Sequence, residues 1–288
     1  MTTPRQPQSQ TLDVNGLALH YLDWGNLGAP PVVCVHGYTS SAQAFNALAR
    51  RFLDRHHIIA PDVRGHGESG WSRSGAYQYS DQVGDLAASV DKLGLSRFTL
   101  IGTSMGGIIA MAYAGAHPDR LTHLVINDIG PEIETGSQRI TQMVGSRPDE
   151  FATLDDAMAY RRQMSPIVAG RSLEDQRELA LGVLKQRPDG RWVWKMDPAY
   201  IQQRVQHGAP PRPALWPVLR SLPCPTMVVW GTKSDVLSGA QAARMVGALP
   251  RGELVTVPGV AHAPTLLEPV VLAALEHFLA AVAGRTPA

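Results

Sequence analysis

The sequence predicts an α/β fold, namely a doubly wound, mostly parallel β-sheet with helices on both faces. Two observations lead to this prediction. Short apolar runs without alternation, such as 32–35 and 58–60, are typical of strands that are covered on both faces, as in a parallel sheet. Segments with apolar residues at helical spacing alternate with these runs, which is the pattern of helices that connect parallel strands.

The first 130 residues begin with an antiparallel hairpin and then alternate strands with helices. Asn15 and Gly16 stand between two alternating runs, and an Asn-Gly pair in this position predicts a type I′ turn. The apolar patterns then predict, in chain order, strand 32–35, helix 45–52, strand 58–60, helix 80–93, strand 97–102, helix 104–116 and strand 123–128.

The alternation stops between about 131 and 216, where helical signals dominate. Thr153, Ser172 and Asp197 each precede a helical pattern and are residue types that cap helix N-termini. Alternation returns with strand 225–231, helix 240–249, strand 253–257 and helix 269–283. We therefore expect a core built from residues 1–130 and 217–288, with residues 131–216 inserted after the sixth strand as a helical cap, or lid.

Composition and charge argue against several function classes. The 288 residues include 26 Lys and Arg and 25 Asp and Glu, a formal charge of +1, without a long basic run. This pattern predicts no binding to nucleic acid or to an anionic membrane. Two cysteines, Cys34 and Cys224, are too few for a zinc site, so no metal is expected. The chain shows neither a signal peptide nor eighteen uninterrupted apolar residues, which predicts a cytoplasmic protein. The sequence indicates no oligomeric state.

The stretch GTSMGG, residues 102–107, joins a predicted strand to a predicted helix. Glycines at 102 and 106 let the strand enter the helix too tightly for a Cβ, and Ser104 between them is expected to take a strained backbone angle. Its hydroxyl would then lie at a helix N-terminus, where backbone donors favour developing negative charge. Alone, the motif also fits a small residue at a tight junction, so the nucleophile hypothesis depends on a base and an acid later in the chain.

His262 is the best candidate for the base, because it follows a strand and a turn and lies at a strand's carboxyl end. The acid that orients the imidazole should also follow a strand. Asp235, in the stretch WGTKSDVLS, is preferred for this role. Asp128, which ends the strand before the insertion, is the alternative acid, unless it is a structural aspartate that closes the turn.

An oxyanion hole needs backbone donors close to the nucleophile. Met105 directly follows Ser104 and is expected to supply one N–H. The loop HGYTSS after strand 32–35 should supply the other, and Tyr38 is the preferred position. His36 is expected to brace that loop, and the stretch DVRGHGES, residues 62–69, is expected to form a structural turn under the site.

Five stretches occur in an order that resembles the α/β-hydrolase fold family over nearly the whole chain: VHGYTSS, PDVRGHGES, GTSMGG, WGTKSDVLS and GVAHAPTLLEP. The chain is similar to the serine-nucleophile branch, including bacterial carboxylesterases and 3-oxoadipate enol-lactonase-like hydrolases. The resemblance implies that no cofactor is needed. Dehalogenases and epoxide hydrolases of this fold carry aspartate where Ser104 stands, so both activities are disfavoured. Ala263 follows His262, where many carbon–carbon bond hydrolases have tryptophan.

We therefore expect a serine hydrolase that cleaves a small carboxylic ester or lactone through an acyl-enzyme. A carbon–carbon bond hydrolase or an amide hydrolase with the same three residues is the first alternative. A non-catalytic small-molecule-binding protein on the same fold is the second. Arginines of the insertion, such as Arg139, Arg161 and Arg162, could meet a substrate carboxylate, although arginines usually face water. The residues expected to line the substrate pocket are Tyr38, Met143, Tyr160, Trp192 and Trp194.

Overall fold

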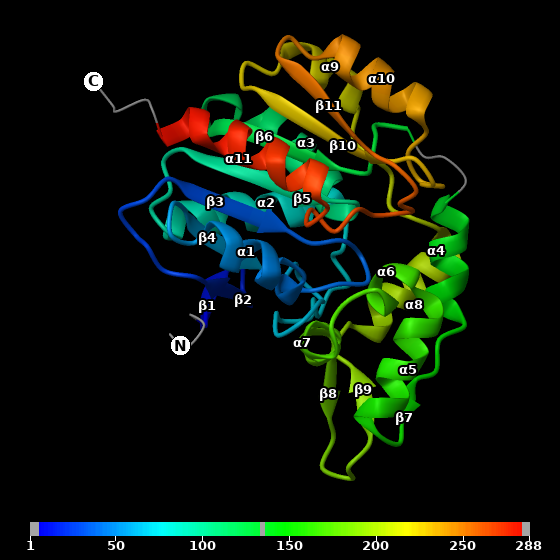
Figure 1. Ribbon diagram of the computed structural model, residues 1–288. Helices are drawn as coiled ribbons and strands as arrows, with labels where there is room; N and C mark the ends of the chain where they lie inside the picture. The colour runs from blue at the N-terminus through cyan, green and yellow to red at the C-terminus, as the bar shows by residue number, and fades with distance from the viewer. Residues whose placement is uncertain (1–5, 133–135, 284–288) are drawn as a thin grey trace.

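A computed structural model describes residues 6–132 and 136–283, and an eight-stranded sheet crosses its centre (Figure 1). The strand order is β1-β2-β4-β3-β5-β6-β10-β11. β1 and β2 are antiparallel to each other, β2 is antiparallel to β4, and the remaining neighbours are parallel. The predicted fold class is therefore confirmed. The strands are β1 (Gln8–Val14), β2 (Leu17–Asp23), β3 (Pro31–Val35), β4 (His57–Pro61), β5 (Phe98–Thr103), β6 (Leu121–Asn127), β10 (Thr226–Gly231) and β11 (Gly252–Val257).

Helices cover both faces of this sheet. α1 (Asn46–Phe52) and α11 (Pro269–Ala283) lie on the face nearer the viewer in Figure 1. α2 (Tyr79–Lys92), α3 (Met105–Ala116), α9 (Leu215–Ser221) and α10 (Gly239–Ala248) cover the other face. Successive strand residues point to opposite faces, so the apolar strands supply two separate cores. Val32 and Cys34 belong to the core under α1 and α11, whereas Val33 and Val35 belong to the core under α2 and α3.

The predicted hairpin turn and helix caps are present. Asn15 and Gly16 have φ angles of 52° and 75°, as a type I′ turn requires. The side chains of Thr153, Ser172 and Asp197 each accept a hydrogen bond from a backbone N–H in the first turn of the following helix. These local signals in the sequence were therefore sufficient to place the helix starts.

The chain between β6 and α9 forms a separate layer, which we call the inserted segment (residues 136–207). It lies at the lower right of Figure 1, in green to yellow. Its helices are α4 (Gly136–Gly145), α5 (Leu154–Met164), α6 (Pro166–Ala169), α7 (Leu173–Val183) and α8 (Pro198–His207). It also holds a small antiparallel sheet of β7 (Glu150–Phe151), β9 (Trp192–Trp194) and β8 (Leu184–Gln186), in that order.

This small sheet was not predicted, because strands of two or three residues are too short to show a period. The helix that follows Ser172 ends at Val183, and Leu184 turns to an extended conformation. Helix α9 spans the expected boundary at residue 216 and packs against α3.

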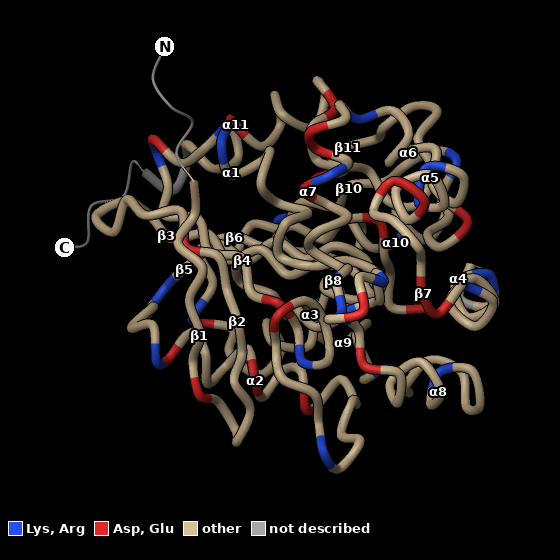
Figure 2. Tube along the Cα trace, turned by 90° about the horizontal axis from the view of Figure 1, so that it is seen from below, with Lys and Arg blue, Asp and Glu red and all other residues tan. Residues whose placement is uncertain are grey.

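Several expectations from composition can be compared with the structure. Cys34 and Cys224 are free and buried. Figure 2 shows Lys and Arg residues interspersed with Asp and Glu over this view of the chain. Among the described residues, no helix is long and apolar enough to cross a membrane. The same part of the chain contains no group of three or more His, Cys, Asp or Glu residues that could hold a metal ion.

Candidate active site

Ser104 stands at a tight junction between β5 and α3. Its backbone angles, φ 54° and ψ −117°, lie in a strained region for a residue with a side chain. A Cβ on Gly106 would lie 2.1 Å from the main-chain oxygen of Val35, and one on Gly102 would lie 2.3 Å from the oxygen of Gly106. Both positions therefore require glycine, because the helix lies directly against the strands. This close packing holds the Ser104 side chain at the N-terminus of α3.

His262 bridges the Ser104 hydroxyl to a buried carboxylate. It lies in the loop between β11 and α11, and its Nε2 is 2.8 Å from Ser104 Oγ. Its Nδ1 is 2.9 Å from Asp128 Oδ2. With a proton on Nδ1, the imidazole donates to Asp128 and accepts the hydroxyl hydrogen of Ser104 at Nε2. This arrangement can withdraw a proton from the serine as its oxygen attacks an electrophile.

The structure corrects the choice of acid, since Asp128 rather than Asp235 accepts the hydrogen bond from His262. Asp128 directly follows β6, the sheet neighbour of β5, and has a φ of 57°. Its side chain is fully buried, its N–H donates to the oxygen of Val229, and its Oδ1 accepts from the N–H of Gly231 at 3.0 Å. These bonds aim Oδ2 at the imidazole.

Asp235 occupies a different position. It lies four residues beyond the end of β10, one strand farther from Ser104 than Asp128. Both oxygens of its carboxylate accept hydrogen bonds from Arg139 of α4, and 39% of its side-chain surface is exposed. The hydrogen bond from Arg139 holds the pKa of Asp235 below its ordinary value, with a smaller contribution from the charge of His262. Asp235 therefore ties the inserted segment to the loop after β10.

The loop after β3 runs past Ser104, as expected for an oxyanion loop. A Cβ on Gly37 would lie 3.4 Å from the Cβ of Ser104, and Tyr38 lines the same cavity as Ser104. Met105 is the first residue of α3, so its N–H is one of the donors left free at a helix N-terminus. The Tyr38 ring is buried and packs edge-on against Tyr200 at 5.1 Å between ring centroids.

Buried polar residues hold that loop in place. His36 Nδ1 bonds to the oxygen of Gly37, and its Nε2 accepts from the N–H of Val63 at 3.0 Å. Burial lowers the pKa of His36, so the ring favours the neutral form that this pair of bonds needs. Asp62 accepts hydrogen bonds from His20, at 2.7 Å, and from the N–H groups of Ala42 and Glu68. His36 and the turn at 62–69 therefore have the structural roles that the sequence predicts.

A cavity of about 290 Å³ opens onto Ser104 and His262, between the sheet and the inserted segment. Of the residues expected to line it, Tyr38, Met143, Tyr160 and Trp194 do so. Trp192 does not line it; it is the first residue of β9 and pairs with Phe151 in the small sheet. Four arginines also line the cavity: Arg139, Arg147, Arg161 and Arg171. Arg139 and Arg161 are among the arginines that the sequence analysis considers as partners of a substrate carboxylate. No sequence pattern predicts that Arg147 or Arg171 lines the cavity.

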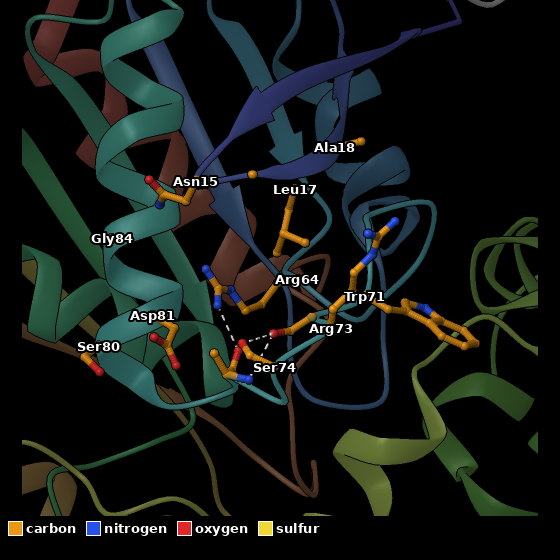
Figure 3. A pocket seen from close by; sticks show the side chains of 13 residues that line it. Asn15, Leu17, Ala18, Arg64, Trp71, Arg73, Ser74, Ser80, Asp81 and Gly84 are labelled. Carbon is orange, nitrogen blue, oxygen red and sulfur yellow. Dashed lines mark hydrogen bonds between the residues drawn. The ribbon is translucent and has the colours of Figure 1, made fainter.

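A second, larger cavity of about 820 Å³ lies away from Ser104, between the tip of the β1–β2 hairpin and α2 (Figure 3). Of its charged residues Arg64, Arg73 and Asp81, Arg64 is already paired, because Nε and Nη2 each lie 2.6 Å from an oxygen of Asp85. Serines line this cavity, but its described lining includes no histidine that could serve as their base. We therefore place the candidate active site at Ser104.

Comparison with known proteins gives consistent results. A family model described as alpha/beta hydrolase fold matches residues 30–269. The chain is 31% identical to the 3-hydroxybutyrate-oligomer hydrolase of Cupriavidus necator, over 96% of this chain and 98% of that one. It is 27% identical to the 2-(acetamidomethylene)succinate hydrolase of Mesorhizobium japonicum, over 94% and 95%. The crystal structure of an alpha/beta hydrolase from Novosphingobium aromaticivorans superposes with a TM-score of 0.84 at 33% identity, over 96% and 98%.

Proposed function

The chain belongs to the α/β-hydrolase fold family, and we propose that it is a carboxylic-ester hydrolase in which Ser104, His262 and Asp128 form the catalytic triad. That it is a hydrolase of this fold is supported by its relatives. The main support for ester hydrolysis by this triad is the continuous chain of hydrogen bonds from the Ser104 hydroxyl through His262 to the buried carboxylate of Asp128. A neutral alcohol needs such a base to attack a carbonyl carbon near neutral pH.

Acylation follows from this geometry. Ser104 Oγ attacks the ester carbonyl while its proton passes to His262 Nε2, and the imidazolium is stabilised by Asp128. The oxyanion accepts hydrogen bonds from the N–H groups of Met105 and Tyr38, assisted by the positive end of the α3 dipole. His262 then donates the proton to the leaving alkoxide, and the alcohol departs.

Deacylation uses the same groups in reverse. His262 removes a proton from water, the resulting hydroxide attacks the acyl carbon, and Ser104 leaves as the alcohol after regaining a proton from the imidazolium. Asp128 keeps the imidazole in the tautomer with the proton on Nδ1 in the resting state.

The inserted segment acts in this proposal as a cap over the acyl or alcohol side of the substrate. Met143, Tyr160 and Trp194 supply apolar walls of the cavity, while Ser104 and His262 come from the sheet. Small-molecule sites commonly combine such apolar walls with a few polar groups. A volume of about 290 Å³ favours a small ester or lactone.

The relatives widen the set of esters to be tested. An oligomer of a hydroxy acid is joined by ester bonds, so the similarity to a 3-hydroxybutyrate-oligomer hydrolase makes short hydroxy-acid oligoesters candidate substrates. The similarity to a 2-(acetamidomethylene)succinate hydrolase favours amide hydrolysis as the second candidate function. The same three residues could attack an amide carbonyl.

A substrate panel separates these functions. Simple esters of increasing acyl length, lactones, 3-hydroxybutyrate oligomers and the matching amides would be incubated with the protein and with a Ser104→Ala variant. We expect ester turnover that falls by about 10⁴ to 10⁶ in the variant. Faster turnover of amides than of esters would favour the second function, and ester turnover that survives the substitution would contradict the mechanism.

A further inference from the structure

The cavity above Ser104 has an unusual charge for a small, partly apolar site. Its described lining includes four arginines and neither aspartate nor glutamate. All four come from the inserted segment: Arg139 from α4, Arg147 from the loop after α4, Arg161 from α5, and Arg171 from the loop before α7. Arginines are seldom buried without a partner, because desolvating a charge is costly unless another charge or hydrogen bonds compensate.

Arg139 is neutralised by Asp235, but among the described residues Arg161 has no acidic partner, and burial alone shifts its pKa. Its Nε is buried without a hydrogen-bond partner there. The neighbouring Arg162, by contrast, donates to Gln176 at 3.2 Å and does not line the cavity.

Arg147 lies over an aromatic ring. Its guanidinium is 4.3 Å from the ring centre of Trp194, and Tyr160 also lines the cavity. Burial lowers the pKa of both Arg147 and Arg161 to about 10, so both stay protonated near neutral pH. The cavity therefore contains at least two positive charges that are partly buried and line the same space as the nucleophile.

We propose that the substrate is an ester carrying a free carboxylate, which Arg161 binds with the help of Arg147 while Ser104 attacks the ester carbonyl. A planar guanidinium matches a carboxylate with two parallel hydrogen bonds, and a site that excludes water strengthens them. This inference rests on the proposed ester hydrolysis and specifies its substrate class.

A carboxylate suits this site better than a phosphate dianion. Arg161 lies in the last turn of α5, and Arg147 follows the C-terminus of α4, so both helix ends present their partial negative charge nearby. No lysine is found among the described lining residues, and apolar side chains such as Met143 and Met164 line the same cavity as the arginines. These surroundings favour a singly charged group on a short carbon chain.

Matched esters test the charge without changing the shape of the substrate. The monoethyl esters of succinate, glutarate and adipate would be compared with the corresponding ethyl esters whose free carboxylate is replaced by a carboxamide. Ethanol release would be measured. We expect the best half-ester to have a kcat/KM at least ten times that of its carboxamide partner.

Three variants identify the arginine that causes the preference for the half-ester. Arg161→Met should lower kcat/KM for the half-ester 10- to 100-fold, mainly through KM, and should change the carboxamide ester less than threefold. Arg147→Met should act in the same direction but less strongly. Arg162→Met is the matched control, one position along the same helix and outside the cavity, and should leave both substrates unchanged. Equal turnover of the two esters by the unmodified protein, or an equal loss on both substrates in Arg161→Met, would overturn the proposal.

A binding measurement keeps this inference separate from the hydrolytic mechanism. Glutarate would be titrated into the Ser104→Ala variant by calorimetry, with glutaramide and inorganic phosphate as comparisons. Glutarate binding that weakens at least tenfold on adding Arg161→Met supports the carboxylate site even if no ester is hydrolysed. Absent glutarate binding, or tighter binding of phosphate, contradicts it. Conversely, Ser104-dependent hydrolysis of neutral esters alone would support the proposed function and refute this inference.

Discussion

Replacing Asp128 by asparagine tests which carboxylate orients His262. The substitution changes the group that His262 Nδ1 contacts at 2.9 Å, in a position with no exposed side-chain surface. The asparagine oxygen can still accept the hydrogen bond from the N–H of Gly231, so the loop should keep its shape. If so, an NH₂ group faces Nδ1 and favours the imidazole tautomer with the proton on Nε2, which cannot accept a proton from Ser104.

The expected loss is large. In the serine-protease triad the equivalent exchange lowers kcat by about 10⁴, which corresponds to ~5.4 kcal/mol of transition-state stabilisation. We expect Asp128→Asn to lower kcat on a p-nitrophenyl ester by about 10³ to 10⁴ with a smaller change in KM. Initial rates of nitrophenolate release would measure this.

Asp235→Asn is the matched control, because it makes the same chemical change in the loop after the neighbouring strand β10. Asp235 is partly exposed and binds Arg139, and ion pairs of this kind contribute about 0–1 kcal/mol. We therefore expect less than a fivefold loss of kcat. A greater loss from Asp235→Asn than from Asp128→Asn, with both variants folded by circular dichroism, would refute the assignment of the acid.

Three further predictions concern the scaffold. Gly106→Ala places a Cβ 2.1 Å from a main-chain oxygen of β3, so it should lower the free energy of unfolding by ~3 kcal/mol in urea titrations. Gly247→Ala is the control, because a Cβ at Gly247 on α10 meets open space and should not lower this free energy. Asp62→Asn disturbs a fully buried carboxylate with several donors, and its thermal unfolding should show a loss of ~3 kcal/mol. Although burial raises the pKa of Glu178, the hydrogen bond from Arg50 outweighs this effect, so its pKa is lowered. The pair of Glu178 and Arg50 therefore stabilises the fold fully at pH values above the ordinary glutamate pKa. This stabilisation is lost as the pH falls through the lowered pKa of Glu178 in the folded protein. Because the pair is partly exposed, Glu178→Gln should cost only ~1 kcal/mol at pH 7, and almost nothing once the pH lies below the lowered pKa.

Local signals in the sequence were enough for most of the framework. The Asn15-Gly16 turn, the three helix caps and the glycines around Ser104 each depend on neighbouring residues, and each has the expected geometry. His262 was found because it follows a strand, and the structure brings it within hydrogen-bond distance of Ser104.

The acid and the pocket depend on information that the sequence does not contain. Asp128 and Asp235 both follow strands, and the choice between them depends on β6 lying between β5 and β10 in the sheet. One local signal favours Asp128, since it directly follows its strand whereas Asp235 lies four residues beyond. Arg161 and Arg162 are adjacent in the sequence, so the packing of α5 decides which of them lines the cavity.

Covalent labelling shows whether Ser104 is a nucleophile that His262 activates. The protein would be treated with a fluorophosphonate, and the modified residue would be located by mass spectrometry of its peptides. We expect stoichiometric modification of Ser104, slowed at least a hundredfold in a His262→Ala variant. An unmodified Ser104 in the folded protein, or labelling that does not depend on His262, would contradict it.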